Sequence, residues 1–329
     1  MKHETIALSS LLLAALFASS ARAGGVVNCT SAGGACLGSY SAGTIVTLTA
    51  TPDSGYAFAG WGGDCAGAGR SSAASVTMNA NANCSAAFVA RWAPQITDTW
   101  QLQLQGALNT GYNVAVFEFD LFDTPAATIG ALKSQGRHVV CYFSAGSAEN
   151  WRSDYSQFAP ADKGSALQGW AGEYWVDTRS ANVRAIMSAR MDLAKSKGCD
   201  GVDPDNVDGY TNSTGLPLTA ATQLDYDRFL ASQAQARGLA VGLKNDVGQV
   251  TQLAPSFDFA INESCFDYNE CGVYAAFTTQ GKPVFQIEYD SQYKNATTRA
   301  TLCASAHSLN FRTLVLPQAL DDSFRYSCD

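Results

Sequence analysis

Residues 198–210, GCDGVDPDNVDGY, concentrate oxygen-bearing side chains in one short stretch: Asp200, Asp203, Asp205, Asn206 and Asp208. An isolated acidic run is usually a solvated surface loop, but Gly201, Val202 and Val207 indicate a short buried strand here. Carboxylates at the end of a buried strand can exchange protons with a bound molecule. This stretch is therefore the first candidate for a chemical site.

Polar residues also follow most other apolar segments in the second part of the chain. In chain order they are Glu118, Asp120 and Asp123; Ser144; Asp177 and Arg179; Lys244, Asn245 and Asp246; Asn262 and Glu263; and Glu288. No comparable set occurs where these segments begin. In a parallel barrel, the carboxyl ends of the strands meet at one rim, where functional residues gather. We therefore expect a ring of carboxylates around a cleft.

Eight apolar segments alternate with helical patterns from about residue 95 onward, which predicts an α/β fold with a parallel sheet. The segments are VAVFEFDLF, HVVCYFSAG, YWVDTRS, GVDPDNVD, LAVGLKND, FDFAINE, PVFQIEYD and TLVLPQA. Eight strands within residues 95–329 match a (β/α)8 TIM barrel, which typically has about 250 residues. TWQLQLQ, at 99–105, leaves no room for a helix before the next segment, so we interpret it as an added strand.

Alternation along each strand predicts which side chains point into the barrel. In the first segment, Glu118 and Asp120 share one face and phenylalanines share the other. We expect the aromatic face to contact the helices, which directs the acids inward. The same argument directs Glu288 inward, and it keeps Asp203 and Asp205 together on one side of their strand.

Several kinds of chemistry do not fit the residues present. No GxSxG motif occurs, His138 begins its strand and His307 lies in the last helical segment, so a serine-hydrolase triad is not expected. Three histidines and no CxxC pair argue against zinc. DPDNVDG is like the start of an EF-hand loop, but Val207 occupies a ligand position and no glutamate ends the loop. No metal or cofactor is therefore expected, and paired carboxylates remain, as in glycoside hydrolases.

Six ordered motifs resemble glycoside hydrolase family 114, the endo-α-1,4-polygalactosaminidases, over essentially residues 95–329. They are TWQLQLQG, FEFDLFDT, VVCYFSAGSAENWR, GCDGVDPDNVDGY, GLKND and NESCFDYNEC. The resemblance implies a (β/α)8-barrel enzyme that cuts polymers of α-1,4-linked galactosamine, partly N-acetylated, as found in biofilm exopolysaccharides. It implies that Asp205 and Glu263 are the catalytic carboxylates. It suggests retention of configuration, with Asp205 as nucleophile and Glu263 as acid/base, and it leaves an exchange of these two roles open.

Further residues at the predicted rim are candidates for substrate binding: Asp120, Asp203, Asn206, Tyr142, Ser144, Lys244, Asp246, Asn262 and Glu288. Galactosamine without its acetyl group is cationic at neutral pH, and an acidic rim would concentrate such a polysaccharide. For Glu118, deepest in the barrel, we prefer a buried acid bonded within the protein. The competing hypothesis is a non-catalytic carbohydrate-binding protein on a degenerate barrel, and the presence of both carboxylates favours the enzyme.

The chain before the barrel predicts two further parts. Residues 1–23 resemble a secretory signal peptide, with Lys2 before an apolar run and Ala21-Arg22-Ala23 as a cleavage site. Residues 24–91 predict a small β-rich domain, and their order of motifs resembles a bacterial repeat module of the internalin B-repeat type. Its aromatic residues could stack on sugars, but in a module this small we expect them in its core. The barrel domain is then residues 92–329.

All ten cysteines follow residue 23, with an even number in each predicted domain, which indicates disulfides in an oxidising compartment. We predict Cys265–Cys271 and Cys303–Cys328 pairs, and leave open whether Cys141 and Cys199 are bridged. The formal net charge is −8, and the acidic excess lies beyond residue 91, so nucleic acid is not an expected partner. Because no segment after the signal peptide is long and apolar enough to span a membrane, we expect a secreted protein. We also expect it to be a monomer.

Overall fold

The chain divides into two units, Met1–Arg91 and Trp92–Asp329. The computed structural model describes residues 13–14, 25–31, 34–35, 39–52, 55–69, 71 and 73–329. The predicted signal peptide, residues 1–23, lies outside the described residues except for Leu13–Ala14. Each unit has a hydrophobic core of its own.

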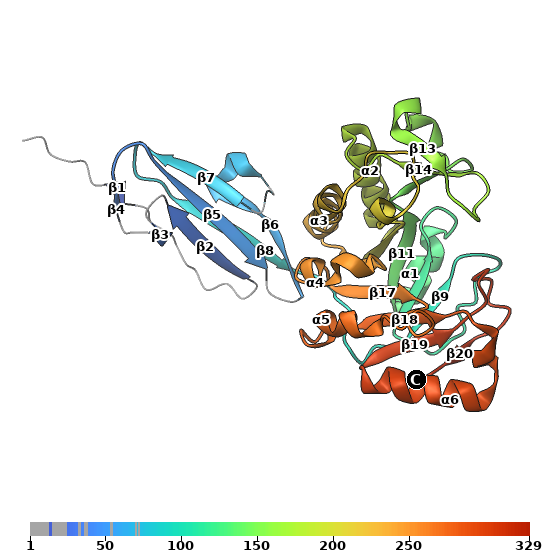
Figure 1. Ribbon diagram of the computed structural model, residues 1–329. Coiled ribbons are helices and arrows are strands. Elements are labelled where there is room, and N and C mark those ends of the chain that lie inside the picture. Colours follow the sequence, from blue (N-terminus) through green and yellow to red (C-terminus); the bar gives the residue numbers. More distant parts are fainter. Residues whose placement is uncertain are drawn as a thin grey trace, which may run out of the picture. The chain divides into compact units, whose positions relative to one another are not determined.

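The first unit is built from antiparallel strands (Figure 1). They are β1 (Leu13–Ala14), β2 (Gly25–Ser31), β3 (Gly34–Ala35), β4 (Ser39–Tyr40), β5 (Thr44–Pro52), β6 (Tyr56–Gly63), β7 (Ala73–Met78) and β8 (Cys84–Ala90). The main sheet has the order β3-β2-β5-β7, β6 pairs with β8, and β1 pairs with β4. Phe58 and Trp61 pack edge to face inside this unit, which confirms that these two aromatic residues belong to its core.

The second unit is a (β/α)8 barrel whose eight strands run parallel (Figure 1). They are β9 (Trp100–Gln103), β10 (Val116–Asp120), β11 (His138–Ser144), β15 (Gly201–Asp205), β16 (Ala240–Lys244), β17 (Phe259–Glu263), β18 (Val284–Glu288) and β19 (Phe311–Val315). They pair in this order, and β20 (Tyr326–Ser327) adds to β19 in the antiparallel direction. The Trp100 indole N–H donates to the Arg312 carbonyl at 2.8 Å, so side-chain bonding bridges the first and last barrel strands.

The barrel has eight strands, as predicted, but one of the eight comes from a different segment of the chain. TWQLQLQ contributes β9, the first barrel strand, because Trp100 and Leu102 pack in the barrel interior beside Val116 of β10. The assignment of YWVDTRS to the barrel is wrong, since β14 (Glu173–Val176) lies in a separate antiparallel sheet. That sheet has the order β12-β14-β13, with β12 at Ser147–Glu149 and β13 at Lys163–Ala166.

Helices cover the outside of the barrel (Figure 1). They are α1 (Ala126–Ser134), α2 (Ala181–Lys197), α3 (Ala220–Ala236), α4 (Val250–Leu253), α5 (Ala275–Thr278) and α6 (Ala296–Ser308). Short 3-10 turns occupy Ala66–Ala68 in the first unit and Tyr155–Gln157, Pro160–Asp162, Gly209–Thr211, Val247–Gln249, Cys271–Tyr274 and Ser291–Lys294 in the second. Helix α2 begins after Ser180, whose hydroxyl caps two backbone N–H groups, and ends at Gly198 in the left-handed region. None of the described helices is long and apolar enough to cross a membrane.

Alternation on the strands separates two apolar layers. Phe117 and Phe119 of β10 pack with Ile129 and Leu132 of α1, which confirms that the aromatic face of this strand meets the helices. The opposite face of β10 begins with Val116, which packs in the interior layer. Glu118 and Asp120 therefore point inward, as predicted.

The predicted orientation of β18 is wrong. Phe285 stacks on Trp100 at a centroid distance of 4.9 Å, and Ile287 lies in the same interior layer. Gln286 and Glu288 therefore point outward, toward the helices, and Tyr289 is directed inward. The reason is that both faces of a barrel strand are buried, so aromatic side chains alone do not tell which face meets the helices.

Four disulfides are formed by described cysteines: Cys65–Cys84, Cys141–Cys199, Cys265–Cys271 and Cys303–Cys328. The two predicted pairs are confirmed. Cys141 and Cys199, which the sequence left open, are bridged between β11 and the segment just before β15. The Cys265–Cys271 bridge closes a short loop directly after β17, at the rim of the barrel.

Candidate active site

A cleft of about 680 Å³ opens at the carboxyl ends of the barrel strands. Its floor includes Tyr142 from β11, Asp205 from β15, Lys244 from β16, Glu263 from β17 and Tyr289 after β18. The segment between β13 and β14 contributes a further wall, with Leu167, Gln168 and Trp170. Part of the predicted ring of polar strand ends therefore lines a real cavity at the barrel mouth.

Asp205 and Glu263 approach the same ammonium group. Lys244 Nζ lies 3.9 Å from Asp205 Oδ1 and 4.0 Å from Glu263 Oε2. These two carboxyl oxygens are thus separated by no more than the sum of the two distances. Strands β15 and β17 are not neighbours, and Lys244 on the intervening strand β16 is the group that connects their carboxylates.

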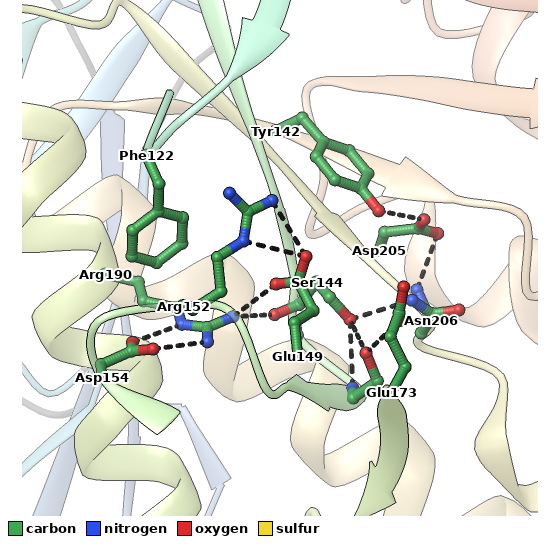
Figure 2. A network of polar contacts seen from close by, with 12 residues as sticks. Phe122, Tyr142, Ser144, Glu149, Arg152, Asp154, Glu173, Arg190, Asp205 and Asn206 are labelled. Carbon is green, nitrogen blue, oxygen red and sulfur yellow. Dashed lines mark hydrogen bonds and ion pairs between the residues drawn. The ribbon is translucent and has the colours of Figure 1, made fainter. Parts of the chain in front are cut away.

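Each carboxylate also accepts a phenol hydrogen bond. The Tyr142 hydroxyl donates to Asp205 Oδ2 at 2.9 Å, as Figure 2 shows, and the Tyr289 hydroxyl donates to Glu263 Oε1 at 2.6 Å. Asn245 Nδ2 donates to Glu263 Oε2 at 3.0 Å. Burial alone would raise the pKa of Glu263, but Lys244, Tyr289 and Asn245 outweigh it and lower that pKa below its usual value.

The chain leaves all three of these strands through a left-handed residue. Asn206, Asn245 and Ser264 follow Asp205, Lys244 and Glu263 directly and have φ angles of 60°, 46° and 62°. Residues other than glycine rarely adopt this region, and such positions cluster at functional sites. The turns let the strand-end side chains face the cleft while the backbone continues outward. Asparagine tolerates this conformation comparatively well, which fits two of the three positions.

A second layer of charge lies below the cleft. Asp203 accepts a hydrogen bond from Lys244 Nζ at 3.1 Å, and Glu118 lies beside Asp203, deeper in the barrel. Burial, followed by the negative charge of Asp203, raises the pKa of Glu118 well above its usual value. Glu118 thus keeps its proton, which can bond to Asp203, while ionised Asp203 pairs with Lys244. Glu118 is therefore buried, as the sequence interpretation preferred, but its neighbour is the carboxyl group of Asp203.

The structure brings part of the predicted binding set to the cleft. Tyr142, Asn206, Lys244 and Asp246 line it together with the two proposed catalytic carboxylates. Ser144 is fully buried behind Asn206, whose Nδ2 donates to its hydroxyl at 2.9 Å (Figure 2).

Other predicted binding residues have partners within the protein. Asp120 is buried and pairs with the Arg152 guanidinium. Asn262 points outward, and its amide contacts Tyr274 and Asn245. Glu288, also outward, accepts from the Phe266 backbone N–H at 2.9 Å and does not line the cleft.

Asp246 is among the residues that line the cleft, but its two carboxyl oxygens are buried. They lie near Asp227 and Tyr210, and burial raises the pKa of Asp246 to about 7. The carboxyl group of Asp246 therefore points into the protein, between β16 and α3.

Several cleft residues were not among the predicted catalytic or substrate-binding residues. They are Trp170, Glu173, Asp208, Tyr268, Glu270 and Tyr289. Asp208, Tyr268 and Glu270 stand inside motifs already recognised, so their positions offered a signal. Trp170 and Glu173 lie just before YWVDTRS, the segment that was taken for a barrel strand, and only the small β12-β14-β13 sheet places them at the cleft.

Comparison with known proteins agrees with this geometry. Residues 81–329 match the glycoside-hydrolase family GH114, and residues 17–91 match the divergent InlB B-repeat domain. The structure of Aspergillus fumigatus Ega3 in complex with galactosamine is 43% identical, with a TM-score of 0.69, over 73% of this chain and 98% of that one.

Two more distant proteins are also similar. The glycoside hydrolase domain of PelA from Pseudomonas aeruginosa is 19% identical, with a TM-score of 0.55, over 68% of this chain and 96% of that one, and shares the fold. A Deinococcus radiodurans protein is 28% identical over 64% of this chain and 77% of its own length. Since the family match spans the whole barrel and its cleft, this chain belongs to the glycoside-hydrolase family GH114 and is a glycoside hydrolase.

Proposed function

We propose that this protein is a secreted, endo-acting hydrolase of α-1,4-linked galactosamine polymers that are partly N-acetylated. The observation that carries the proposal is the pair Asp205 and Glu263, both facing one cleft and both within 4.0 Å of Lys244 Nζ. The similarity to Ega3 in complex with galactosamine supports the substrate class. An open cleft, rather than a closed pocket, suits attack within a long chain.

The charge of the cleft supports a cationic substrate. Five carboxylates line it, Glu173, Asp205, Asp208, Glu263 and Glu270, against one lysine. That lysine is already paired with Asp203 below the cleft. A polymer carrying ammonium groups would therefore meet a negative surface and gain favourable interactions along its length.

The proposed mechanism uses the two carboxylates in different roles. Asp205, held by Tyr142 and Lys244, attacks the anomeric carbon while Glu263 gives a proton to the leaving oxygen, and Glu263 then activates the water that releases the product. Retaining glycosidases separate these groups by about 5–5.5 Å and inverting ones by about 6.5–9.5 Å. The upper limit set by the two Lys244 distances admits either separation, so the choice of retention rests on the resemblance to the family.

The lowered pKa of Glu263 bears on its role as acid. At neutral pH the free carboxyl group is ionised, so it must gain its proton at lower pH or when substrate binds. Substrate excludes water from the cleft, and loss of water raises the pKa of a carboxyl group. The first catalytic step should therefore be favoured at mildly acidic pH.

The proposal includes export and the role of the first unit. Four disulfides in the described part of the chain support an oxidising compartment. We assign residues 1–23 to a signal peptide, 24–91 to a repeat module that acts as a spacer or attachment domain, and 92–329 to the catalytic barrel. The catalytic domain acts as a monomer.

The deciding experiment measures reducing ends released from purified α-1,4-galactosamine polymer, followed by mass spectrometry of the products. We expect internal cleavage to give a series of short oligosaccharides. Proton NMR of the first-formed product should show the α-anomer, as retention requires. Binding without any product would favour the non-catalytic carbohydrate-binding protein, and a β-anomer appearing first would overturn the nucleophile role of Asp205.

A further inference from the structure

Glu173 is the least expected carboxylate in the cleft. It begins β14, lines the cleft, and is only 7% exposed. The Ser147 hydroxyl donates to its Oε2 at 2.7 Å. Its Oε1 accepts no hydrogen bond from any described residue, and no lysine, arginine or histidine nitrogen of the described chain comes within 4.0 Å of it.

A neighbouring glutamate, Glu149, provides a comparison, because it is a buried carboxylate that is fully paired. Glu149 of β12 is the register partner of Glu173 and is similarly buried, at 3% exposed. Arg152 contacts Glu149 Oε1 at 2.9 Å, and Arg190 approaches its Oε2 at 3.7 Å. Figure 2 shows both arginines gathered on the Glu149 side. Two adjacent buried carboxylates thus differ in that only one has counter-ions.

Burying a carboxylate without a cation is costly, and proteins rarely leave one so. Burial raises the pKa of Glu173 to about 7; the Ser147 bond opposes the shift, and the charges of Glu149 and Asp205 add to it. The positive charge of Arg152 lowers the pKa of Glu173, but it offsets the rise only in part. A cation that enters from the cleft would therefore stabilise the ionised form strongly.

Glu173 is also connected to the proposed nucleophile. Ser147 bonds to Ser144 at 2.6 Å, Ser144 accepts from Asn206, and the Asn206 backbone N–H donates to Asp205 Oδ1 at 2.7 Å. Figure 2 shows this chain from Glu173 toward Asp205. In a 2-amino sugar, the nitrogen is attached to the carbon next to the anomeric centre. A protein group that binds this nitrogen must therefore lie beside the residue that attacks the anomeric carbon.

We propose that Glu173 is a specificity-determining residue that binds the free ammonium group of a galactosamine unit placed against Asp205. This inference rests on the proposed function and adds to it a preference for de-N-acetylated sugar at that unit. An acetamide has no positive charge and more bulk, so it would leave the Glu173 carboxylate without a counter-ion. The rest of the cleft would still hold such a chain.

The test compares Glu173→Gln with wild type on two substrates, a fully de-N-acetylated α-1,4-galactosamine oligomer and its fully N-acetylated counterpart. The quantity measured is the ratio of their kcat/KM values. We expect Glu173→Gln to lower this ratio about tenfold or more. The substitution removes a hydrogen bond between two charged groups, and only the de-N-acetylated substrate makes that bond. Glutamine keeps the shape and can still accept from Ser147.

Glu149→Gln is the matched control, since it removes a neighbouring buried charge outside the cleft. Because removal of the Glu149 charge favours ionised Glu173, this variant should not lower the ratio, even if thermal unfolding shows a loss of stability. An unchanged ratio in Glu173→Gln, or an equal change in both variants, would overturn the inference while wild-type cleavage still supports the proposed function. Failure of wild type to release reducing ends from either oligomer would instead refute the proposed function itself.

Discussion

Lys244 is the residue on which the geometry of the site depends most. It is buried, and its ammonium is shared among Asp203, Asp205 and Glu263 at 3.1, 3.9 and 4.0 Å. Burial alone would lower the pKa of Lys244, but the surrounding carboxylates, Asp203 first, raise it well above its usual value. Lys244 therefore stays charged, and it orients the two upper carboxylates without presenting an unpaired cation to the substrate.

We predict that Lys244→Met moves the alkaline limb of the kcat/KM profile to higher pH. The Lys244 ammonium lowers the pKa of Glu263, so removing it lets Glu263 keep its proton to higher pH. The proposed acid must be protonated for the first step, so the alkaline limb follows its pKa. The measurement is the pH dependence of kcat/KM with Lys195→Met, an exposed lysine, as control. An alkaline limb that stays in place would contradict this role.

The two proposed catalytic residues give a second prediction. Asp205→Asn and Glu263→Gln should each retain less than a tenth of wild-type turnover, because a neutral amide can neither attack nor transfer the required proton. The fold should remain, since both side chains are at strand ends. Turnover and thermal unfolding are measured beside Asp177→Asn, whose carboxylate pairs with Arg179 at 2.7 Å outside the cleft. Greater residual turnover in either variant would reject its assignment.

At the scale of elements, the small sheet β12-β14-β13 shapes the cleft. It interrupts the connection between β11 and β15, and its segment Leu167–Trp175 brings aromatic and acidic side chains to one wall. The Gly146 backbone N–H and the Ala145 N–H both bond to the Asp205 carbonyl, which joins this excursion to the end of β15. A Cβ on Gly146 would meet the Asn206 carbonyl at 1.6 Å, so only glycine allows this close approach.

This sheet gives a third prediction. Trp170 is 48% exposed and lines the cleft, which suits stacking against a sugar ring, whereas Trp151 is 53% exposed and does not line it. Trp170→Ala should lower kcat/KM on polymer severalfold, with stability close to wild type, because aromatic stacking adds about 0.5–1.5 kcal/mol. Trp151→Ala is the matched control. Equal effects of the two substitutions on polymer hydrolysis would show that Trp170 does not contact substrate.

At the scale of the whole molecule, the two units have separate interiors. The core of the first contains Leu48, Phe58 and Trp61, and the proposed catalytic pair belongs entirely to the second. Trp92, the first residue of the second unit, stacks on His138 at 4.5 Å and packs against the barrel interior. A deletion that removes the first unit must therefore end before Trp92.

Deletion of residues 24–91 is the fourth prediction. Because none of the described residues of that segment lines the cleft, kcat/KM on soluble oligosaccharides should stay within about twofold of the full chain, as for separate compact domains. Hydrolysis of surface-bound polymer should fall if the module attaches the enzyme. The assay is run on both substrate forms, with circular dichroism to establish folding. A folded barrel that no longer cleaves soluble oligosaccharide would refute the independence of the two units.

The sequence by itself determined the class of fold, the family and the residues at most strand ends. Strand alternation correctly directed Glu118 and Asp120 inward, since Phe117 and Phe119 pack on α1. It also brought Asp205 and Glu263 into one rim, because the carboxyl ends of parallel strands lie on the same side of a barrel. These conclusions depend on local pattern and on one general property of the fold.

Only the tertiary structure decided which strands pair and which face of each points inward. YWVD and WQLQ have similar local preferences, and pairing partners distant in sequence assigned the first to a side sheet and the second to the barrel. Phe285 faces inward because Trp100 and Phe259 meet it there. Glu173 stands in no motif, and it became a cleft residue because β14 packs between β12 and β13, which leaves its carboxylate beside Asp205 without a counter-ion.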